Sequence, residues 1–330
     1  MNISQNTARS NESYSARSPQ VRQVLLRQMM MEIRKAVSGK DRVIFKVLIA
    51  ILAGGHILLE DIPGVGKTTL ALAISRTLSL SCKRIQFTPD VLPSDVTGFS
   101  MYNQSQERFV FKKGAAFCNL LLADEINRTS SKTQSALLEL MEEGSVTIEG
   151  ETYPLPSPHI VIATQNPITC VGTQKLPESQ LDRFLMKLSM GYPDSDDEIA
   201  LLSARSDHNP LDDVKSLAGA SDIMRMRHAV EQTYVSPAIY RYVVALTGAT
   251  RNHPQIRLGI SPRGSLALLQ SAKAVAFARG RDYVLPDDIQ YICADVFCHR
   301  LLLRSGLDGG ASAEQIVEGI LQSVPVPDPE

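Results

Sequence analysis

The sequence lacks the cysteine pairs that would cross-link a small fold or hold a metal ion. None of its five cysteines forms a Cys-x-x-Cys pair with another. They are scattered over apolar or helical stretches, at positions 82, 118, 170, 293 and 298. An odd, scattered set of this kind indicates reduced thiols in a cytosolic protein and argues against a disulfide framework or a zinc site.

The sequence also lacks an excess of one charge and a long apolar run. Lys plus Arg (34) nearly cancels Asp plus Glu (35), so no global field recruits nucleic acid or an acidic membrane surface. The longest apolar run, Val43 to Leu52, is interrupted by Lys46 and falls short of the roughly 20 residues of a membrane span. We therefore expect a soluble, cytoplasmic protein with no nucleic-acid binding and no direct membrane insertion.

The N-terminal stretch has no apolar core either. Met1 to Pro19 is rich in Ser, Asn and Gln, which argues against a signal peptide and predicts a disordered N-terminal arm over residues 1–19. The whole chain of 330 residues suits two domains of about 100–200 residues each. No repeat of the solenoid kind is evident.

From residue 20 to Met190, helical and strand patterns alternate. Helices are expected within Val21–Val37, up to about Leu52, and over Thr69–Leu80. The expected strands, the central ones unbroken apolar runs, are His56–Glu60, Arg84–Thr88, Asn119–Asp124, Ile160–Gln165 and Phe184–Met190. Such alternation predicts an α/β core with a five-stranded parallel sheet that is covered on both faces.

The strand patterns stop at the polar stretch 193–197, which we take as a domain boundary. The helices expected beyond it are Glu198–Arg205, Ala220–Gln232, Pro237–Arg251, Pro262–Arg279 and Pro286–Leu303. Ser236-Pro237 and Ser261-Pro262 each place a capping serine before a proline at the first helical position. The prediction is a core over residues 20–194 and an all-α domain over 195–330.

Two segments of the core depart from the alternation. Phe99–Tyr102 and Phe109–Phe111 flank a polar turn, and Val146–Ile148 and Thr152–Leu155 flank Glu149-Gly150. Each pair predicts a β-hairpin inserted between core elements. Such insertions are more often functional surfaces than decorative loops.

A glycine-rich loop follows the first strand. Gly66-Lys67-Thr68 supplies the end of the pattern G-x-x-x-x-G-K-[ST], although Asp61 stands where the first glycine is usual. Backbone N–H groups around the glycines and the following helix N-terminus would bind the phosphates of ATP, and Lys67 would reach the β- and γ-phosphates. The predicted nucleotide-binding residues of the loop are Pro63, Gly64, Val65, Gly66, Lys67, Thr68 and Thr69. A chance glycine turn is the weaker reading, because strand, loop and helix follow in the required order.

Two carboxylates end the strand Asn119–Asp124. Asp124 would orient Mg²⁺ together with the Thr68 hydroxyl, and Glu125 would serve as the general base that polarises the attacking water. Alternation along the strand would turn the two side chains to different sides. A solvated acidic strand end is the alternative, less favoured beside such a loop. The next strand, Ile160–Thr164, leads to Gln165-Asn166-Pro167, whose amide could position water, although Asn-Pro alone is a turn signal.

Five separated blocks resemble, in order, the MoxR-type AAA+ ATPases, over nearly the whole chain from about Val37 to the C-terminus. The blocks are Glu60–Thr69, Asp124–Arg128, Ala163–Pro167, Leu176–Phe184 and Ser261–Arg263. The family often lacks the first glycine of the loop. Residues 168–175 depart from the family pattern, in which an acidic residue and a tyrosine are usual.

The resemblance implies a P-loop AAA+ core followed by a helical lid, and it implies roles for further polar residues. Asn166 would be the sensor-1 residue and Arg183 an arginine finger that acts on the ATP of a neighbouring subunit. Arg263 would be sensor 2, reading the γ-phosphate bound in its own subunit. The two hairpins would be the helix-2 insert and the pre-sensor hairpin of a clade similar to metal-chelatase ATPase subunits.

The resemblance also implies an assembly: a homo-oligomeric ring, expected to be hexameric, that remodels or matures a client protein, often with a von Willebrand factor A partner. Two other functions stay open. The chain could be a nucleotide-controlled binding module with little turnover, which would not need Glu125 as a base. A small-molecule kinase is disfavoured by the arginines and by the absence of an evident acceptor site. Arg183 could instead pair internally with Asp182, and Arg263 could be a surface charge.

Overall fold

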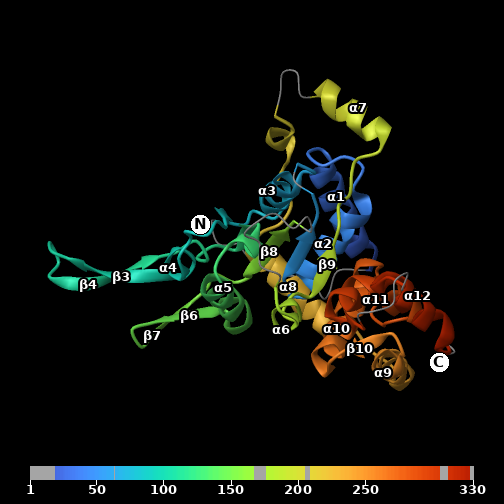
Figure 1. Cartoon of the computed structure of the whole chain (residues 1–330). Helices are drawn as coiled ribbons and strands as arrows, with labels where there is room; N and C mark the ends of the chain where they lie inside the picture. The colour runs from blue at the N-terminus through green and yellow to red at the C-terminus, as the bar shows by residue number, and fades with distance from the viewer. Residues whose placement is uncertain (1–18, 63, 167–175, 205–208, 305–310, 328–330) are drawn as a thin grey trace, which may run out of the picture.

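A five-stranded parallel sheet lies at the centre of the α/β core, as predicted (Figure 1). The structure is a computed structural model that describes residues 19–62, 64–166, 176–204, 209–304 and 311–327. In spatial order the strands are β2 (Cys82–Gln86), β5 (Leu120–Asp124), β8 (Ile160–Gln165), β1 (Ile57–Glu60) and β9 (Met186–Leu188). Because every pairing in this sheet is parallel, all five strands end at one edge, here called the carboxyl edge, and start at the amino edge.

Both faces of the sheet are buried. Leu120 and Leu122 of β5 pack into one apolar cluster, and Leu121 and Ala123 into another on the opposite face. The first cluster includes residues of α1 (Pro19–Arg34), α2 (Asp41–Leu52) and α3 (Lys67–Thr77), and the second those of α4 (Pro93–Thr97) and α5 (Ser131–Glu143). This double burial explains why the central strands are unbroken apolar runs.

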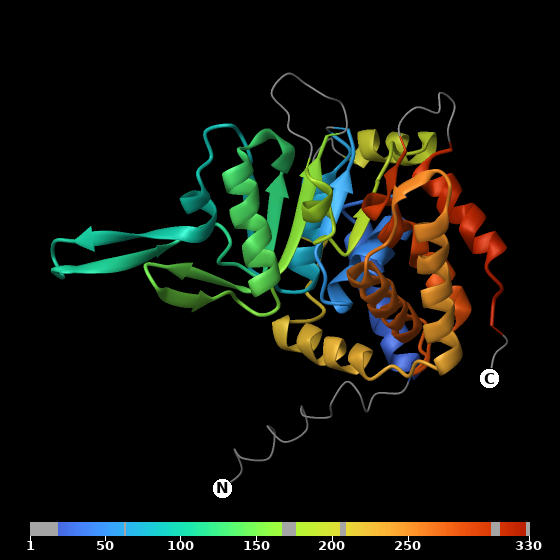
Figure 2. The same cartoon turned by 60° about the horizontal axis from the view of Figure 1, so that its bottom comes forward.

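The two predicted hairpins are present and project from the same side of the core (Figures 1 and 2). They consist of β3 (Gly98–Asn103) with β4 (Arg108–Lys113), and of β6 (Ser145–Ile148) with β7 (Glu151–Pro154). The Phe111 ring stacks on the Tyr153 ring with 4.1 Å between ring centroids, so the hairpins contact each other. Phe99, Met101, Tyr102 and Phe109 of the first hairpin are exposed.

The C-terminal part is mainly helical. Its helices are α7 (Ser195–Ala204), α8 (Ala220–Glu231), α9 (Pro237–Asn252), α10 (Pro262–Ala278), α11 (Pro286–Phe297) and α12 (Ala313–Ser323). The capping serines are confirmed, because the side chains of Ser236 and Ser261 accept hydrogen bonds from the backbone N–H groups of Ile239 and Gly264. The polar stretch 193–197 leads into α7. The described residues also form the short helices α6 (Glu178–Leu181), η2 (Ile126–Arg128), η3 (Pro210–Asp213) and η4 (Cys298–Arg300).

The C-terminal part is helical as predicted, apart from one short pairing of strands where a helix was expected. A helix was expected to continue to Leu303, but α11 ends at Phe297, and β11 (Leu302–Leu303) pairs antiparallel with β10 (Ile256–Leu258). The cause is a pair of buried polar side chains after α11. His299 and Arg300 both bond the Phe184 carbonyl oxygen in the core, which draws the chain out of its helical path.

No helix in the described part of the chain is long and apolar enough to cross a membrane. Cys82, Cys118, Cys293 and Cys298 are free thiols that pack against apolar neighbours, whereas Cys170 lies outside the described residues. The predicted N-terminal arm also lies outside them, apart from Pro19, where α1 begins. The lid helices α10 and α11 share one apolar cluster with α1 and α2, so the C-terminal part is anchored on the core.

Candidate nucleotide site

The loop after β1 turns tightly into α3 at the carboxyl edge. Gly64 and Gly66 have φ angles of +89° and +95°, in the left-handed region that favours glycine. Helix α3 begins at Lys67, and its N-cap, Gly66, supplies no side-chain hydrogen bond. The backbone N–H groups of the first turn are therefore available for an anion. Pro63, which the sequence assigns to the same loop, lies outside the described residues.

Asp61, which replaces the usual first glycine, ties the loop to the end of β9. It is 7% exposed, and its carboxylate accepts hydrogen bonds from the backbone N–H of Met190 and from the Ser189 hydroxyl. Its backbone carbonyl oxygen accepts a bond from the Lys67 ammonium at 2.8 Å. The departure from the sequence pattern therefore adds an anchor between the loop and the segment after β9.

Lys67 is held close to the acidic residues of the site. Partial burial lowers the pKa of its ammonium group, while Asp61, Asp124 and Glu125 act in the opposite direction. The lysine sits at the start of α3, where the partial positive charge of the helix also favours an anion. A phosphate group bound here would meet fixed positive charge from both.

Asp124 and Glu125 are both oriented by the hydroxyl of Thr164, which is fully buried. The hydroxyl donates to Asp124 Oδ1 at 2.6 Å and accepts from the Glu125 backbone N–H at 2.9 Å. Strand β5 ends at Asp124, and Glu125 has a left-handed backbone with φ 56°. The Glu125 side chain is thus directed by this turn, and not by the strand alternation that the sequence suggested. Both carboxylates face the same cavity.

Three polar residues that the sequence did not single out complete this network. Arg84 donates to Asp124 Oδ2 at 2.7 Å and to Gln86 Oε1 at 3.0 Å. Gln86 donates to Glu125 Oε2 at 2.8 Å, and Arg128 donates to the same oxygen at 2.7 Å. Arg84 and Gln86 are two residues apart on β2, so their side chains lie on the same face of the strand. Because β2 pairs with β5, the strand register places both side chains beside the two carboxylates. The sequence signal for Arg84 and Gln86 was the polar alternation along this strand, and Arg128 belongs to the block Asp124–Arg128.

These side chains line a cavity of about 340 Å³ at the carboxyl edge. Its lining includes most of the residues that the sequence assigned to nucleotide and metal binding: Gly64, Gly66, Lys67, Thr68, Thr69, Asp124, Glu125 and Asn166, together with Arg84 and Gln86. Val65 lies between the two glycines but packs against the apolar core. A second cavity of about 440 Å³ is lined by residues 39–43, Lys46, Asp295 and residues 188–190. Its Met190 side chain also approaches Gly66, so the second cavity adjoins the loop.

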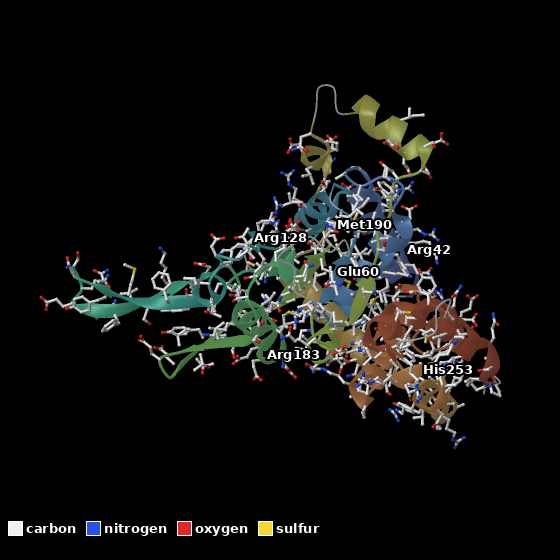
Figure 3. All side chains as sticks on the ribbon, viewed as in Figure 1. Arg42, Glu60, Arg128, Arg183, Met190 and His253 are labelled. Atoms are coloured by element: carbon white, nitrogen blue, oxygen red, sulfur yellow. The ribbon has the colours of Figure 1, made fainter. Side chains whose placement is uncertain are left out.

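Arg183 lies at the opposite, amino edge of the sheet. It precedes β9, whose first residue, Met186, pairs with Ile57 at the start of β1. The glycine-rich loop instead follows Glu60 at the end of β1, and a four-residue strand spans about 10 Å. Figure 3 shows Arg183 on the lower side of the core and Arg128 and Met190 on the upper side. Arg183 is therefore separated from the nucleotide cavity of its own chain.

Arg263 lies beside Arg183, because both bind Glu142 at the end of α5. Arg183 Nη1 is 2.5 Å from Glu142 Oε2, and Arg263 Nη2 is 2.9 Å from Glu142 Oε1. The resemblance suggested that Arg263 reads the γ-phosphate of its own subunit, and this structure does not place it there. The start of α10 is held at the amino edge, where Ser261 donates to Asp182 Oδ2 at 3.2 Å. Asp182 itself pairs with Arg300 at 2.7 Å.

Two family profiles and several known proteins match this chain. The profile of the ATPase family associated with various cellular activities (AAA) matches residues 56–186, and that of the AAA lid domain matches residues 248–320. A crystal structure of a candidate ATPase from Cytophaga hutchinsonii is 39% identical to this chain, with a TM-score of 0.87. That match covers 94% of this chain and 97% of the other.

Curated relatives match over most of their length. The Bacillus subtilis protein YeaC is 46% identical over 92% of this chain and 95% of its own length. Chaperone MoxR1 of Mycobacterium tuberculosis is 39% identical over 92% of this chain and 82% of its own length. Protein MoxR of Methylorubrum extorquens is 32% identical over 90% of this chain and 93% of its own length.

Proposed function

Since the chain belongs to the MoxR family of AAA ATPases, we propose that it binds and hydrolyses ATP as a ring of identical subunits and uses the energy to remodel a client protein. The observation that carries the proposal is the convergence of Lys67, Asp124 and Glu125 on one cavity at the carboxyl edge. These are a phosphate-binding cation, a metal-binding carboxylate and a base. The ring and the client are inferred from family membership and from the position of Arg183.

ATP would occupy both cavities around the glycine-rich loop. The triphosphate fits the first, where the uncapped start of α3 and Lys67 supply N–H donors and positive charge. The adenine ring of ATP fits the second cavity, where Val43, Leu188 and Met190 offer apolar surface. Because Met190 lines the second cavity and approaches Gly66, one ligand can extend from one cavity into the other.

The donors at the cavity suit Mg²⁺, which prefers oxygen ligands. The Thr68 hydroxyl and the Asp124 carboxylate would hold the ion, which supplies charge neutralisation at the phosphates. Asp124 is already turned toward the cavity by Thr164, and Arg84 pairs with its second oxygen. Arg84 lines the same cavity, so its guanidinium group would also lie near the phosphates.

Glu125 would take the proton of the attacking water, and Asn166 would orient that water from the end of β8. Gln86 and Arg128 each donate a hydrogen bond to one oxygen of Glu125. These hydrogen bonds fix where the carboxylate points. The Glu125 carboxylate would thus be in position before the nucleotide binds.

Arg183 would serve the nucleotide of a neighbouring subunit. It is at the amino edge and separated from its own cavity by the length of the strands, whereas a guanidinium group accelerates phosphoryl transfer only in contact with the phosphates. Arg263 shares its position through Glu142, so we assign both arginines to the same neighbour. A subunit alone would then lack part of its active site.

The hairpins give the client a place to bind. Phe99, Met101, Tyr102 and Phe109 remain exposed on an arm that projects from the core (Figure 2), and exposed apolar side chains on one element are typical of interaction surfaces. A von Willebrand factor A partner and a hexameric ring stay predictions of the family resemblance.

The competing function is a nucleotide-controlled binding module with little turnover. Phosphate release and ATP-induced thermal stabilisation, measured together, separate the two. Glu125→Gln should keep the stabilisation by ATP but lose about 10²–10⁴ in rate. Lys67→Ala should lose both, including nearly all of the roughly 2.7 kcal/mol that ATP adds at 100 times its Kd. Equally low phosphate release by the wild type and Glu125→Gln, with the stabilisation by ATP retained, would favour the binding module.

A further inference from the structure

Glu142 is the meeting point of the two arginines that face away from their own nucleotide cavity. Its two carboxylate oxygens are divided between them, Oε2 with Arg183 Nη1 and Oε1 with Arg263 Nη2. Arg183 Nη1 also donates to the Leu138 carbonyl oxygen one turn earlier in α5, at 2.8 Å. In the described residues these bonds use one nitrogen of each guanidinium group, so further N–H groups remain for a phosphate.

The segments that carry the two arginines are joined by a second carboxylate. Asp182, next to Arg183, accepts bonds from Arg300 Nε and from the Ser261 hydroxyl, two residues before Arg263. Arg300 is 7% exposed and also bonds the carbonyl oxygens of Phe184 and Leu185. The backbone around both arginines therefore forms one fixed platform, and Glu142 sets the position of their side chains on it.

We propose that Glu142 is a positioning residue that holds the guanidinium groups of Arg183 and Arg263 together, so that both reach one phosphate group of the neighbouring subunit. The proposal rests on the trans role of Arg183 in the proposed function. Two guanidinium groups repel each other, and a carboxylate between them offsets this repulsion. The negative charge of Glu142 is itself unfavourable beside a bound phosphate. Its contribution to turnover must therefore come from the positions in which it holds the two arginines.

Glu142 contributes little to folding, which makes its role testable. Its side chain is 38% exposed, and those of Arg183 and Arg263 are 31% and 45% exposed, so solvent screens both ion pairs. Glu142→Gln keeps the shape of the side chain but loses the charge that two cations share. We expect turnover to fall by about 10- to 100-fold, the scale set by misplacing a catalytic group by about 1 Å.

The matched variants are Glu143→Gln and Glu142→Asp. Glu143 is the next residue of α5, is exposed, and should tolerate the same change with unaltered turnover. Glu142→Asp retains the charge on a shorter side chain and should keep more activity than Glu142→Gln. The KM for ATP should stay near the wild-type value in all three, because the glycine-rich loop and Lys67, which bind the nucleotide, are unchanged. Wild-type turnover in Glu142→Gln would overturn the proposal.

Mixed rings of full-length subunits locate the defect. In an equimolar mixture of Glu142→Gln and Glu125→Gln subunits, about a quarter of the interfaces join the intact base of a Glu142→Gln subunit to the intact finger of a Glu125→Gln subunit. Turnover should therefore rise toward a quarter of the wild-type value. With Arg183→Ala subunits no interface gains an intact finger, and turnover should not exceed that of Glu142→Gln alone. Equal rescue by both partners, or by neither, would overturn the proposal.

The mixture of Arg183→Ala with Glu125→Gln is the reference. Its recovery shows that fingers act between subunits, so a failure confined to the Glu142→Gln mixtures would then overturn only the role of Glu142. If the reference mixture stays inactive while its subunits exchange, the trans site itself is refuted, and the role of Glu142 is refuted with it.

Discussion

The buried hydroxyl of Thr164 is predicted to support both folding and catalysis, because it hydrogen-bonds both the Asp124 carboxylate and the backbone N–H of Glu125. Replacing it by valine keeps the branched shape and removes both hydrogen bonds, at 2.6 and 2.9 Å. Thr164→Ser is the matched control. It keeps the hydroxyl and removes only the methyl group.

The two variants should differ clearly in stability. A hydrogen bond to a charged group contributes about 1.5–3 kcal/mol, and a buried N–H group without a partner costs about 1–3 kcal/mol. Since one hydroxyl makes both bonds, the two effects overlap, and we expect Thr164→Val to lose about 2–4 kcal/mol of unfolding free energy. Thr164→Ser should lose about 0.8 kcal/mol, the value of one buried methyl group.

Urea denaturation and ATP turnover of the two variants test this reasoning. Thr164→Val should hydrolyse ATP more slowly than Thr164→Ser even where both are fully folded, because its metal-binding carboxylate and its base are both less constrained. If Thr164→Val matched Thr164→Ser in both stability and turnover, the hydroxyl would not be what orients these carboxylates.

Two further predictions concern Arg263 and His56. Arg263→Ala subunits should regain turnover when mixed with Glu125→Gln subunits but not with Arg183→Ala subunits. Rescue by Arg183→Ala instead would place Arg263 on its own nucleotide. Burial lowers the pKa of His56 to about 4, and its Nδ1 accepts from the Val161 N–H, so the neutral ring is favoured. Between pH 6.5 and about 4 the folded state then binds fewer protons than the unfolded state. The free energy of unfolding therefore decreases as the pH is lowered through that window, by about 2 kcal/mol at pH 5. Urea denaturation at pH 7.5 and pH 5 should show a smaller loss in His56→Gln than in the wild type. In exposed His228→Gln the loss should be unchanged, and equal losses in all three proteins would contradict the assignment.

The core of the site could be predicted because its signals are local in the sequence. A strand, two glycines and a helix start fix the conformation of the loop around Lys67, and an unbroken apolar run delivers Asp124 to the carboxyl edge. The five strands were predicted for the same reason. Parallel pairing then brings Asn166 to the same edge without any further information.

The remaining polar contacts depend on packing between distant segments. Arg84 and Gln86 belong to a strand that the sequence indicated, but their partners follow from the register between β2 and β5. The start of the helix at Ser261-Pro262 was readable from its cap, whereas its place beside Glu142 is set by contacts to Asp182. An isolated sequence contains no local signal for such contacts, so the expectation for Arg263 depended on the family resemblance alone.

The C-terminal part shows the same limit. Helical spacing continues past Phe297, but the buried bonds of His299 and Arg300 to the core end the helix there and lead into β11. Side chains that are polar in the sequence and buried in the fold can therefore override a helical pattern.

Turnover of an equimolar mixture of Arg183→Ala and Glu125→Gln subunits tests the central claim most directly. Each protein alone should be nearly inactive. Arg183→Ala should lose about 10³–10⁵ in rate because it lacks the finger, and Glu125→Gln should be slow because it lacks the base. The account predicts recovery of activity on mixing, because some interfaces then join an intact base to an intact Arg183. A mixture that stays as inactive as its components, with subunit exchange demonstrated, would contradict it.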